Sequence, residues 1–467
     1  MDAAESQFQQ FAEKMRTAGS SEVAIRAFHH SYENLLAGQT DLSPENSIEP
    51  VTDLPKLRDL AGFRSARAEL LDQTVLIKLN GGLGTSMGLE NAKVLLEVKN
   101  GLTFLDFIAR QVLDLRQRYA RRPRFLLMNS FSTSTDTLQF LRKYPDLGDP
   151  ASLELMQNQV PKVDARTLGP VSWRENPDLE WCPPGHGDLY PSLLGSGMLD
   201  SFLAEGIRFA FVSNADNLGA TIDLGLLAYF ANSGKPFLME VARRTHSDNK
   251  GGHLARRDGR FMLRESAQCP ENEKTAFQDI ERHRFFNTNN LWLRLDALKQ
   301  LLAAHDGLVP LPLIKNSKTV DPRKKNSPPV FQLETAIGAA IESFEDSGAI
   351  MVPRTRFAPV KTTSDLLVLR SDAYTVTEDW RVVLSDGSSD VPPVVQLDDA
   401  HYKLVEQVNE KTARGVPSLK HCRQLVIRGP ILLSSENIFR GSVSLTNSHP
   451  EPHPLPSGEY KDCARTL

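Results

Sequence analysis

A glycine-rich loop at residues 78–93 is the first stretch of the chain whose residue types suggest chemistry. It follows residues 74–77, a short apolar and β-branched run that predicts a buried strand. Glycine at positions 81, 82, 84 and 88 permits positive φ and lets backbone N–H groups approach a ligand closely. Amides that point inward together bind anions, above all the phosphates of a nucleotide. Lys78 and Lys93 flank the loop and are expected to add positive charge, so the stretch predicts a polyphosphate site.

Two common nucleotide-binding patterns do not fit this loop. A P-loop requires lysine directly after its last glycine, and no lysine follows Gly84 or Gly88. A dinucleotide fingerprint, G-x-G-x-x-G/A, counted from Gly82 and Gly84, reaches Met87 at its last position. Taken alone, the glycine cluster is equally compatible with a simple turn between a strand and a helix.

The complete string of the loop resembles a family signature. Residues 79–88 read Leu-Asn-Gly-Gly-Leu-Gly-Thr-Ser-Met-Gly, and Ala92-Lys93 follow. This is similar to the signature of eukaryotic-type UTP–glucose-1-phosphate uridylyltransferases, whereas relatives that act on N-acetylhexosamine phosphates carry Gly-Gly-Gln-Gly-Thr-Arg-Leu-Gly. Asn80 and Met87 favour the glucose branch. The resemblance runs from about residue 40 to about residue 450, and residues 263–269 and 281–292 are most similar to the kinetoplastid branch.

The resemblance implies that glucose 1-phosphate attacks the α-phosphorus of UTP, which gives UDP-glucose and pyrophosphate. The nucleophile is a phosphate oxygen that is already ionised at neutral pH, so no general base is needed. The site must instead align two repelling anions and stabilise the developing charge. Lysines and a divalent cation meet this requirement, and the sequence offers lysines and an aspartate to hold the cation.

Two lysines match the catalytic lysines of the family. Lys93 closes the glycine loop, and Lys361 ends the run Arg356-Phe-Ala-Pro-Val-Lys. Lys361 precedes a predicted helix with Thr362 and Thr363 as cap candidates, a place where phosphates gather. The competing interpretation of each is an ordinary surface lysine.

Asp216 matches the aspartate that holds Mg²⁺ in the family. It follows an apolar run in Val212-Ser-Asn-Ala-Asp216. Mg²⁺ takes one or two carboxylates together with substrate phosphates, so one well-placed aspartate suffices. The alternative role of Asp216 is to cap the helix predicted near residues 221–230.

The resemblance also assigns substrate contacts. The residues expected to bind UTP are Leu79, Asn80, Gly81, Gly82, Lys93, Gln157, Gly185, Asp216 and Lys361. An amide such as that of Gln157 offers a donor and an acceptor, which suits the uracil edge. The residues expected to bind the sugar phosphate are His186, Asn214, Gly252, Glu265, Asn287 and Asn289. His186 has two interpretations, a phosphate contact or a brace for the preceding Pro-Pro-Gly turn.

Composition excludes several other classes of protein. The chain has 467 residues, 40% hydrophobic and 24% charged, and a net charge of −4, which gives no electrostatic reason for binding nucleic acid or an anionic membrane. Its four cysteines include no C-x-x-C pair, which argues against a disulfide framework or a zinc site and for a reducing compartment. The first residues do not resemble a signal peptide, and no apolar run has the length of a membrane helix. The cytoplasm is the expected location.

Periodicity predicts the elements that position these residues. Helices are expected within residues 1–45 and over 103–119, 132–144, 332–344 and 398–411; strands over 124–128, 207–213, 236–241 and 349–352; and a hairpin over 251–264. Residues 42–51 are interpreted as a linker and residues 321–329 as a basic surface loop. Alternating strands and helices predict a doubly wound α/β domain, with ligands beyond the carboxyl ends of its strands.

Past residue 380, short strands at 425–427, 431–433 and 443–445 suggest a small β domain, and the resemblance implies a left-handed β-helix. The expected organisation is an N-terminal helical segment (1–45), a Rossmann-like, GT-A-type nucleotidyltransferase domain (46–380) and the β-helix (381–467). The resemblance implies a monomer, with a homo-oligomer as the alternative.

Two other functions remain open. One is a broader uridylyltransferase that also uses galactose 1-phosphate, a substrate that differs from glucose 1-phosphate at one stereocentre. The other is a non-catalytic regulatory subunit built on the same fold, which would be expected to lose Lys93, Asp216 or Lys361. An intact set of these three residues favours catalysis.

Overall fold

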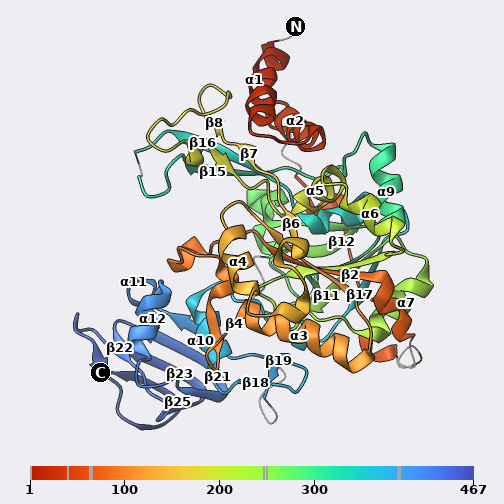
Figure 1. Ribbon diagram of the computed structural model, residues 1–467. Helices are drawn as coiled ribbons and strands as arrows, with labels where there is room; N and C mark the ends of the chain where they lie inside the picture. The colour runs from red at the N-terminus through yellow and green to blue at the C-terminus, as the bar shows by residue number, and fades with distance from the viewer. Residues whose placement is uncertain are drawn as a thin grey trace.

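The computed structural model describes residues 3–38, 42–60, 62, 67–245, 248, 251–324, 326–385 and 391–467. A mixed β-sheet forms its centre (Figure 1). Its strands have the order β1-β12-β14-β10-β2-β5-β6. Strand β11 pairs with β14 and β17, and β13 pairs with β12. The bounds are β1 (Glu49–Pro50), β2 (Thr74–Asn80), β5 (Arg124–Asn129), β6 (Glu154–Met156), β10 (Phe209–Asn214), β11 (Phe237–Arg243), β12 (His253–Arg257), β13 (Arg260–Arg264), β14 (Phe285–Arg294) and β17 (Gly348–Met351).

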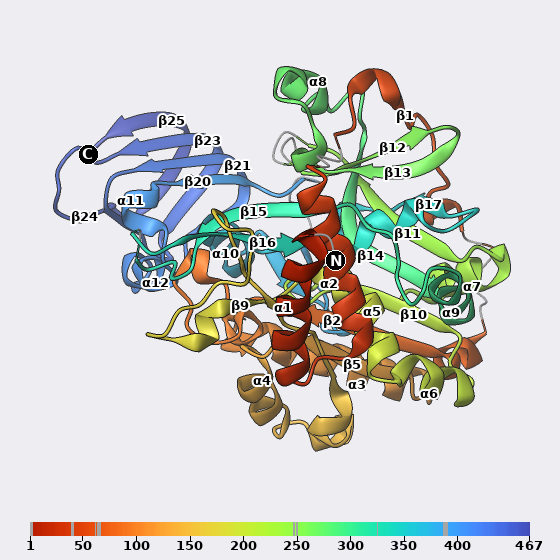
Figure 2. The ribbon, with the colours of Figure 1, turned by 90° about the horizontal axis from the view of Figure 1, so that it is seen from above.

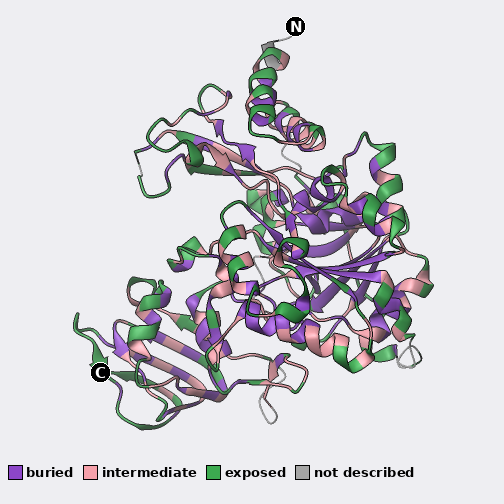
Figure 3. Ribbon diagram, in the orientation of Figure 1, coloured by how far each residue is buried: buried purple, intermediate pink, exposed green. Residues whose placement is uncertain are grey.

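Helices cover both faces of this sheet. They are α5 (Leu189–Gly195), α6 (Met198–Ala204) and α9 (Leu295–Ala304) on one face, and α3 (Phe104–Tyr119) and α7 (Leu224–Ser233) on the other. The helices α4 (Ser134–Leu141), α8 (Lys274–Phe277) and α10 (Thr363–Arg370) belong to the same part of the chain. Val75 and Ile77 of β2 pack into the apolar layer formed with α5, α6 and α9, whereas Leu76 packs into the layer formed with α3 and α7. Because successive strand residues face opposite sides, β2 is apolar on both, and the central strands are buried in Figure 3. The α/β class is confirmed.

The parallel half of the sheet brings the predicted site together. Strand β10 pairs in parallel with β2, so that Ser213 lies beside Lys78 and Asn214 beside Leu79. Parallel strands end at the same edge, and therefore the glycine loop after β2 and the segment with Asp216 after β10 leave the sheet side by side.

The N-terminal helices α1 (Ala3–Thr17) and α2 (Glu22–Leu36) pack on a small outer sheet, as Figure 2 shows from above. Its strands are β15 (Ile314–Thr319), β16 (Pro329–Glu334) and β8 (Val163–Asp164). Phe11 and Phe28 of the helices meet Leu333 of β16 in one apolar cluster. Two short strand pairs complete this part of the fold. Strand β7 (Val160–Pro161) pairs with β9 (Trp181–Cys182) near the N-terminal helices, and β3 (Glu97–Lys99) pairs with β4 (Leu102–Thr103) beside α3.

The predicted helix over residues 332–344 is wrong. Residues 329–334 form strand β16, and residues 337–342 form a 3₁₀ helix. Leu333 and Ile337 have helical spacing, but they belong to different apolar clusters on the two sides of a chain turn. Pairing of β16 with both β15 and β8 satisfies the backbone there, and tertiary contact overrides the local pattern.

The predicted linker over residues 42–51 is also wrong. This stretch contains β1, which pairs with β12 at the edge of the central sheet. The carboxylate of Glu45 accepts hydrogen bonds from Arg282 at 2.6 Å and His283 at 2.9 Å, and from Arg264 at 2.5 Å, whose side chain is fully buried. The stretch is therefore fixed to the β12–β13 hairpin.

The C-terminal part contains parallel strands in the order β20-β21-β23-β25, and β22 paired in parallel with β24. Their bounds are β20 (Val394–Leu397), β21 (Ser418–Arg428), β22 (Ile431–Leu432), β23 (Asn437–Thr446), β24 (His453–Pro454) and β25 (Gly458–Thr466). The helix expected over 398–411 is divided into α11 (Asp399–Tyr402) and α12 (Val405–Lys411). The expected boundary after residue 380 falls inside a hairpin of β18 (Tyr374–Val376) and β19 (Val382–Leu384).

The surface loop at residues 321–329 joins β15 to β16, and its position 325 lies outside the described residues. The four cysteines are free thiols. Among the described residues, no helix is both long and apolar enough to span a membrane.

Candidate active site

The glycine loop turns sharply at the end of β2. Gly84 and Gly88 have φ of 73° and 77°, in the left-handed region that favours glycine. A Cβ at Gly81 would lie 2.6 Å from Oε1 of Gln157, so only glycine fits at this position without displacing that amide. The N–H of Lys93 donates to the carbonyl oxygen of Gly82 at 3.3 Å, which folds the end of the loop back over its beginning.

A cavity of about 300 Å³ opens beside this loop. Seven of the residues predicted for substrate contacts line it: Leu79, Gly81, Gly82, Gln157, Gly185, His186 and Asn214. Three further lining residues were missed by the sequence analysis: Met128, Pro183 and Glu334. Two of them carry a signal in the sequence: Met128 ends a predicted strand, and Pro183 is the first residue of the Pro-Pro-Gly turn before His186. Glu334 was hidden by the wrong helix prediction.

Gly185 and Gln157 form one wall of the cavity. The Gln157 Nε2 amide donates to the Gly185 carbonyl at 2.7 Å, while its Oε1 faces Gly81. Gly185 has φ of 81°, and a Cβ there would lie 2.5 Å from the Thr335 carbonyl. The wall therefore depends on glycine both for its backbone conformation and for the close approach of the chain after β16.

His186 is oriented by the backbone. Its Nδ1 accepts a hydrogen bond from the N–H of Ile337 at 2.9 Å, which places the ring proton of the neutral form on Nε2. Burial lowers the pKa of His186 to about 4. The imidazole is thus neutral near pH 7, and its Nε2–H is a hydrogen-bond donor. This contact supports the bracing role for the side chain and leaves Nε2 for a ligand.

Lys93 and Asp216 contact one another across the two strand ends. Lys93 Nζ lies 2.6 Å from Asp216 Oδ2 and also donates to the Val360 carbonyl. Oδ1 of Asp216 is buried and has no hydrogen-bond partner. A buried carboxylate oxygen without a donor is costly, so this atom is prepared for a cation or a donor from outside the chain. No group of three or more His, Cys, Asp or Glu side chains suited to a metal is present in the described part of the chain.

Lys361 is exposed and lies outside the first cavity. It lines a larger neighbouring cleft with Phe286, and its Nζ is 5.9 Å from the centre of the Phe286 ring. Burial raises the pKa of the Glu265 carboxyl, and the positive charge of Lys361 partly opposes that rise. Lys361 and Glu265 therefore share one electrostatic environment.

The remaining predicted sugar contacts gather at β12–β14. Gly252 faces Glu265 so closely that a Cβ there would lie 2.6 Å from the carboxylate. The Asn287 N–H donates to the Gly252 carbonyl at 3.3 Å, and the Asn287 Nδ2 amide donates to Asn289 Oδ1 at 2.8 Å. Asn289 itself has φ of 56°, a left-handed conformation that asparagine tolerates. These four residues form a polar cluster next to the cleft that holds Lys361.

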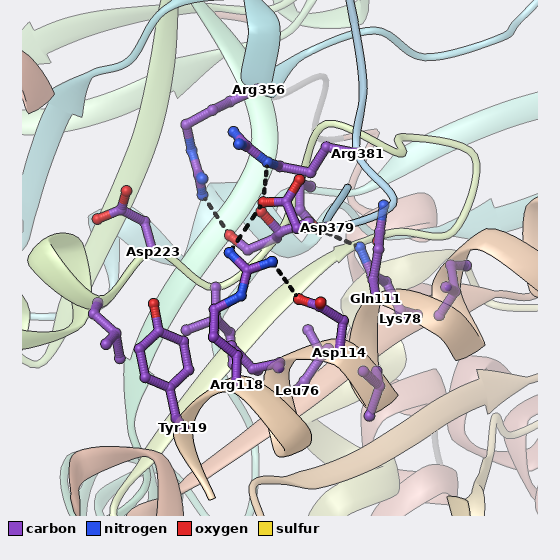
Figure 4. A pocket seen from close by; sticks show the side chains of 17 residues that line it. Leu76, Lys78, Gln111, Asp114, Arg118, Tyr119, Asp223, Arg356, Asp379 and Arg381 are labelled. Carbon is purple, nitrogen blue, oxygen red and sulfur yellow. Dashed lines mark hydrogen bonds and ion pairs between the residues drawn. The ribbon is translucent and has the colours of Figure 1, made fainter. Parts of the chain in front are cut away.

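Two expectations for β2 require correction. Lys78 does not add charge to the loop: it is 1% exposed, and its Nζ donates to Ser213 Oγ at 2.9 Å and the Ala220 carbonyl at 2.6 Å. Burial lowers its pKa to about 7. The side chain lines a cavity on the other side of the sheet, with Gln111 and Arg356 (Figure 4). Asn80 is likewise turned inward, and its Nδ2 donates to Asn129 Oδ1 at 2.7 Å.

The chain is similar to known proteins of one enzyme family. The family model described as UTP–glucose-1-phosphate uridylyltransferase matches residues 25–440. The UTP–glucose-1-phosphate uridylyltransferase of Solanum tuberosum is 39% identical over 85% of this chain and 82% of its own length. The probable enzyme of that name from Schizosaccharomyces pombe is 35% identical over 91% of this chain and 83% of its own.

Solved structures of similar proteins cover the whole fold. A UDP-glucose pyrophosphorylase mutant from Leishmania major, in complex with UDP-glucose, superposes with a TM-score of 0.95 at 48% identity over 100% of both chains. The Trypanosoma brucei protein superposes with a TM-score of 0.93 at 47% identity, over 99% of this chain and 100% of its own. The resemblance expected from the glycine loop is thereby confirmed, and the chain belongs to the UTP–glucose-1-phosphate uridylyltransferase family.

Proposed function

We propose that this protein transfers the uridylyl group of UTP to glucose 1-phosphate, giving UDP-glucose and pyrophosphate in a reversible reaction. One observation carries the proposal: the ends of β2 and β10 bring the glycine loop, Lys93 and the partly buried Asp216 carboxylate, whose Oδ1 has no partner, to a single point. The names of the relatives, each a uridylyltransferase or pyrophosphorylase of UDP-glucose, support the same reaction.

In this proposal the uracil enters the cavity between the glycine loop and the Gln157–Gly185 wall. Leu79, Gly81 and Gly82 meet the nucleoside, and the phosphates extend toward Lys93. The glucosyl group lies against Gly252, Glu265, Asn287 and Asn289, whose polar groups match its hydroxyls. His186 Nε2 holds the sugar phosphate in place, and Lys361 contacts the UTP phosphates that it attacks. Alignment of two anions and neutralisation of their charge are the contributions of the protein.

The residues present fit a magnesium ion. Asp216 supplies a buried oxygen without a donor, and one carboxylate with substrate phosphates is a usual set of Mg²⁺ ligands. When bound, the ion would neutralise charge on the phosphate oxygens of UTP. Lys93 contacts the other oxygen of the same carboxylate and thereby fixes its orientation.

The organisation of the chain is proposed on the resemblance as well. Residues 46–380 would form the GT-A-type nucleotidyltransferase domain after the helical segment 1–45. Residues 381–467 would form a left-handed β-helix domain, which the parallel pairing of β20, β21, β23 and β25 supports. A cytoplasmic monomer is the state that we propose for the enzyme.

The proposed reaction is tested by pyrophosphate release from UTP and glucose 1-phosphate with Mg²⁺. Galactose 1-phosphate, N-acetylglucosamine 1-phosphate and the other nucleoside triphosphates serve as comparisons. We expect strong preference for UTP with glucose 1-phosphate. Comparable turnover of galactose 1-phosphate would indicate the broader enzyme. Folded protein that releases no pyrophosphate with any pair would refute catalysis and indicate the regulatory subunit.

His186→Ala is expected to lower kcat/KM by roughly 10- to 100-fold, because a hydrogen bond to a charged phosphate contributes about 1.5–3 kcal/mol. Since the lowered pKa of about 4 keeps the ring neutral, the ratio of wild-type to variant kcat/KM should stay constant between about pH 5.5 and 8. The ratio removes the effect of substrate ionisation on kcat/KM, because that effect is the same for both proteins. A ratio that grows as the pH falls through 6.5 would show an imidazolium and contradict the neutral role. His421→Ala, on an exposed position of β21, is the control.

A further inference from the structure

Two segments of the site, far apart in the sequence, are joined by one buried side chain. Asn217 follows the proposed metal ligand Asp216 and is 1% exposed. Its Nδ2 donates to the Arg356 carbonyl at 3.1 Å and to Asn290 Oδ1 at 3.2 Å, and its Oδ1 accepts from the Ala358 N–H at 3.1 Å. An isolated β-bridge also pairs Asn217 with Pro359. The loop after β10 is thus bonded directly to the segment that ends in Lys361.

The backbones of these segments are in close contact. A Cβ at Gly219 would lie 2.3 Å from the Thr355 carbonyl oxygen, so no side chain fits between them. Lys93 Nζ contacts both Asp216 and the Val360 carbonyl, one residue before Lys361. The position of Lys361 relative to Lys93 and Asp216 is therefore set by contacts on both sides of Asn217.

A buried ion pair anchors the same segment beneath the site. Glu240 of β11 is fully buried and accepts from Arg356 Nε at 2.8 Å and Arg356 Nη2 at 2.7 Å. Trp292 Nε1 donates to the same carboxylate at 2.9 Å, and Arg356 Nη2 also donates to the Thr221 carbonyl at 2.9 Å. Arg356 is fixed against Glu240 of β11. Asn217, which is bonded to the Arg356 carbonyl, therefore links this fixed segment to the loop that contains Asp216.

We propose that Asn217 is a positioning residue that holds Lys361 in register with Asp216 and Lys93 during uridylyl transfer. The inference rests on the proposed function. Its partners are two acceptors and one donor, and only an uncharged amide offers the complementary set within one short side chain. A misplacement of about 1 Å at a reacting centre costs on the order of 10²-fold in rate, so a residue that never touches substrate has a large effect on turnover.

The test compares Asn217→Ala with Asn447→Ala. Asn447 is 4% exposed and makes the same kind of contacts in the C-terminal part, donating to the Pro430 and Glu451 carbonyls and accepting from the His449 N–H. Both variants lose three hydrogen bonds. Asn217→Ala should lower kcat roughly 10- to 100-fold and weaken the binding of Mg-UTP by a smaller, few-fold factor, and both effects should disappear when Lys361 is absent. Asn447→Ala should lower thermal stability similarly and leave kcat unchanged.

A double-mutant cycle with Lys361→Ala separates positioning from general damage. If Asn217 acts through Lys361, Asn217→Ala should have almost no effect on kcat once Lys361 is absent. Independent, multiplicative effects of the two substitutions would overturn the proposal. Gly219→Ala is a second variant, because it pushes the segments apart without removing a hydrogen-bonding group, and it should show the same dependence on Lys361.

Failure of the proposed function is recognised separately in the wild-type protein. Wild-type turnover of UTP and glucose 1-phosphate tests the reaction itself, before any variant is compared. The binding free energy of Mg-UTP is also measured by calorimetry for the wild type, the two single variants and the double variant. These four values give the coupling energy between Asn217 and Lys361 without any turnover. Additive binding free energies in that cycle would overturn the positioning role whichever reaction the protein catalyses.

Discussion

Lys361→Ala is expected to lower kcat for UDP-glucose formation by about 10²-fold or more with almost no change in thermal stability. The side chain is exposed, and no described residue forms a hydrogen bond or ion pair with its Nζ, which lies 5.9 Å from the centre of the Phe286 ring and whose charge acts on the Glu265 carboxyl. The fold therefore does not depend on it. Removal of a preorganised positive charge from a site where negative charge develops costs on the order of 10²–10³ in kcat. Pyrophosphate release and thermal unfolding measure the two quantities.

Lys461→Ala is the matched control for this substitution. Lys461 is also exposed, but it lies on β25 in the C-terminal part, away from the glycine loop. Its removal changes net charge equally and should leave kcat at the wild-type value. A folded Lys361→Ala protein with wild-type kcat would contradict the assigned role.

Asp216→Asn is expected to lower kcat by about 10²-fold or more at ordinary Mg²⁺ concentrations and to shift the Mg²⁺ titration to higher concentration. The amide keeps the shape of the side chain and an oxygen for Lys93, but it removes the charge next to the unpartnered Oδ1. The quantities to measure are kcat as a function of Mg²⁺ concentration and calorimetric binding of Mg²⁺ with UTP.

Asp106→Asn provides the comparison for Asp216. Asp106 also accepts from a lysine, Lys143 at 2.6 Å, and is 2% exposed, but it lies at the start of α3. The same chemical change there should lower stability and leave the Mg²⁺ titration unchanged. Superimposable Mg²⁺ curves for wild type and Asp216→Asn would exclude Asp216 as the metal ligand.

Much of the site could be predicted from the sequence because its residues lie at the ends of neighbouring parallel strands. Leu79, Gly81 and Asn214 lie at the ends of two apolar runs, and parallel strands place such ends together whatever the rest of the fold. The direction of each side chain is harder to predict. Lys78 and Asn80 are next to Leu79, yet the period of two along β2 turns them to the opposite face. Only the register of the sheet reveals that their polar groups are used inside the protein.

Long-range contacts account for the features that were missed. Glu240 is a charge within residues 237–242, the otherwise apolar and buried part of β11, which is a signal of a buried partner. The sequence does not indicate that Arg356 is that partner. Glu334 and the strand around it depend on β8 and the N-terminal helices, more than 150 residues upstream. The interpretation of residues 42–51 as a linker failed in the same way, because β1 finds its neighbour only in β12.

The pairing of β1 with β12 also fixes an order of events during synthesis. The carboxylate of Glu45 and the edge strand Glu49–Pro50 emerge from the ribosome about 200 residues before their partners in β12 and around Arg264. At about 5–20 residues per second, that interval is roughly 10–40 s. During this time β2 and β5, which are close in sequence, can already pair with one another. The edge of the sheet at β1 is therefore completed late. Because β1 has only two residues and one of them is proline, it exposes few unpaired backbone groups to other chains before β12 has been synthesised.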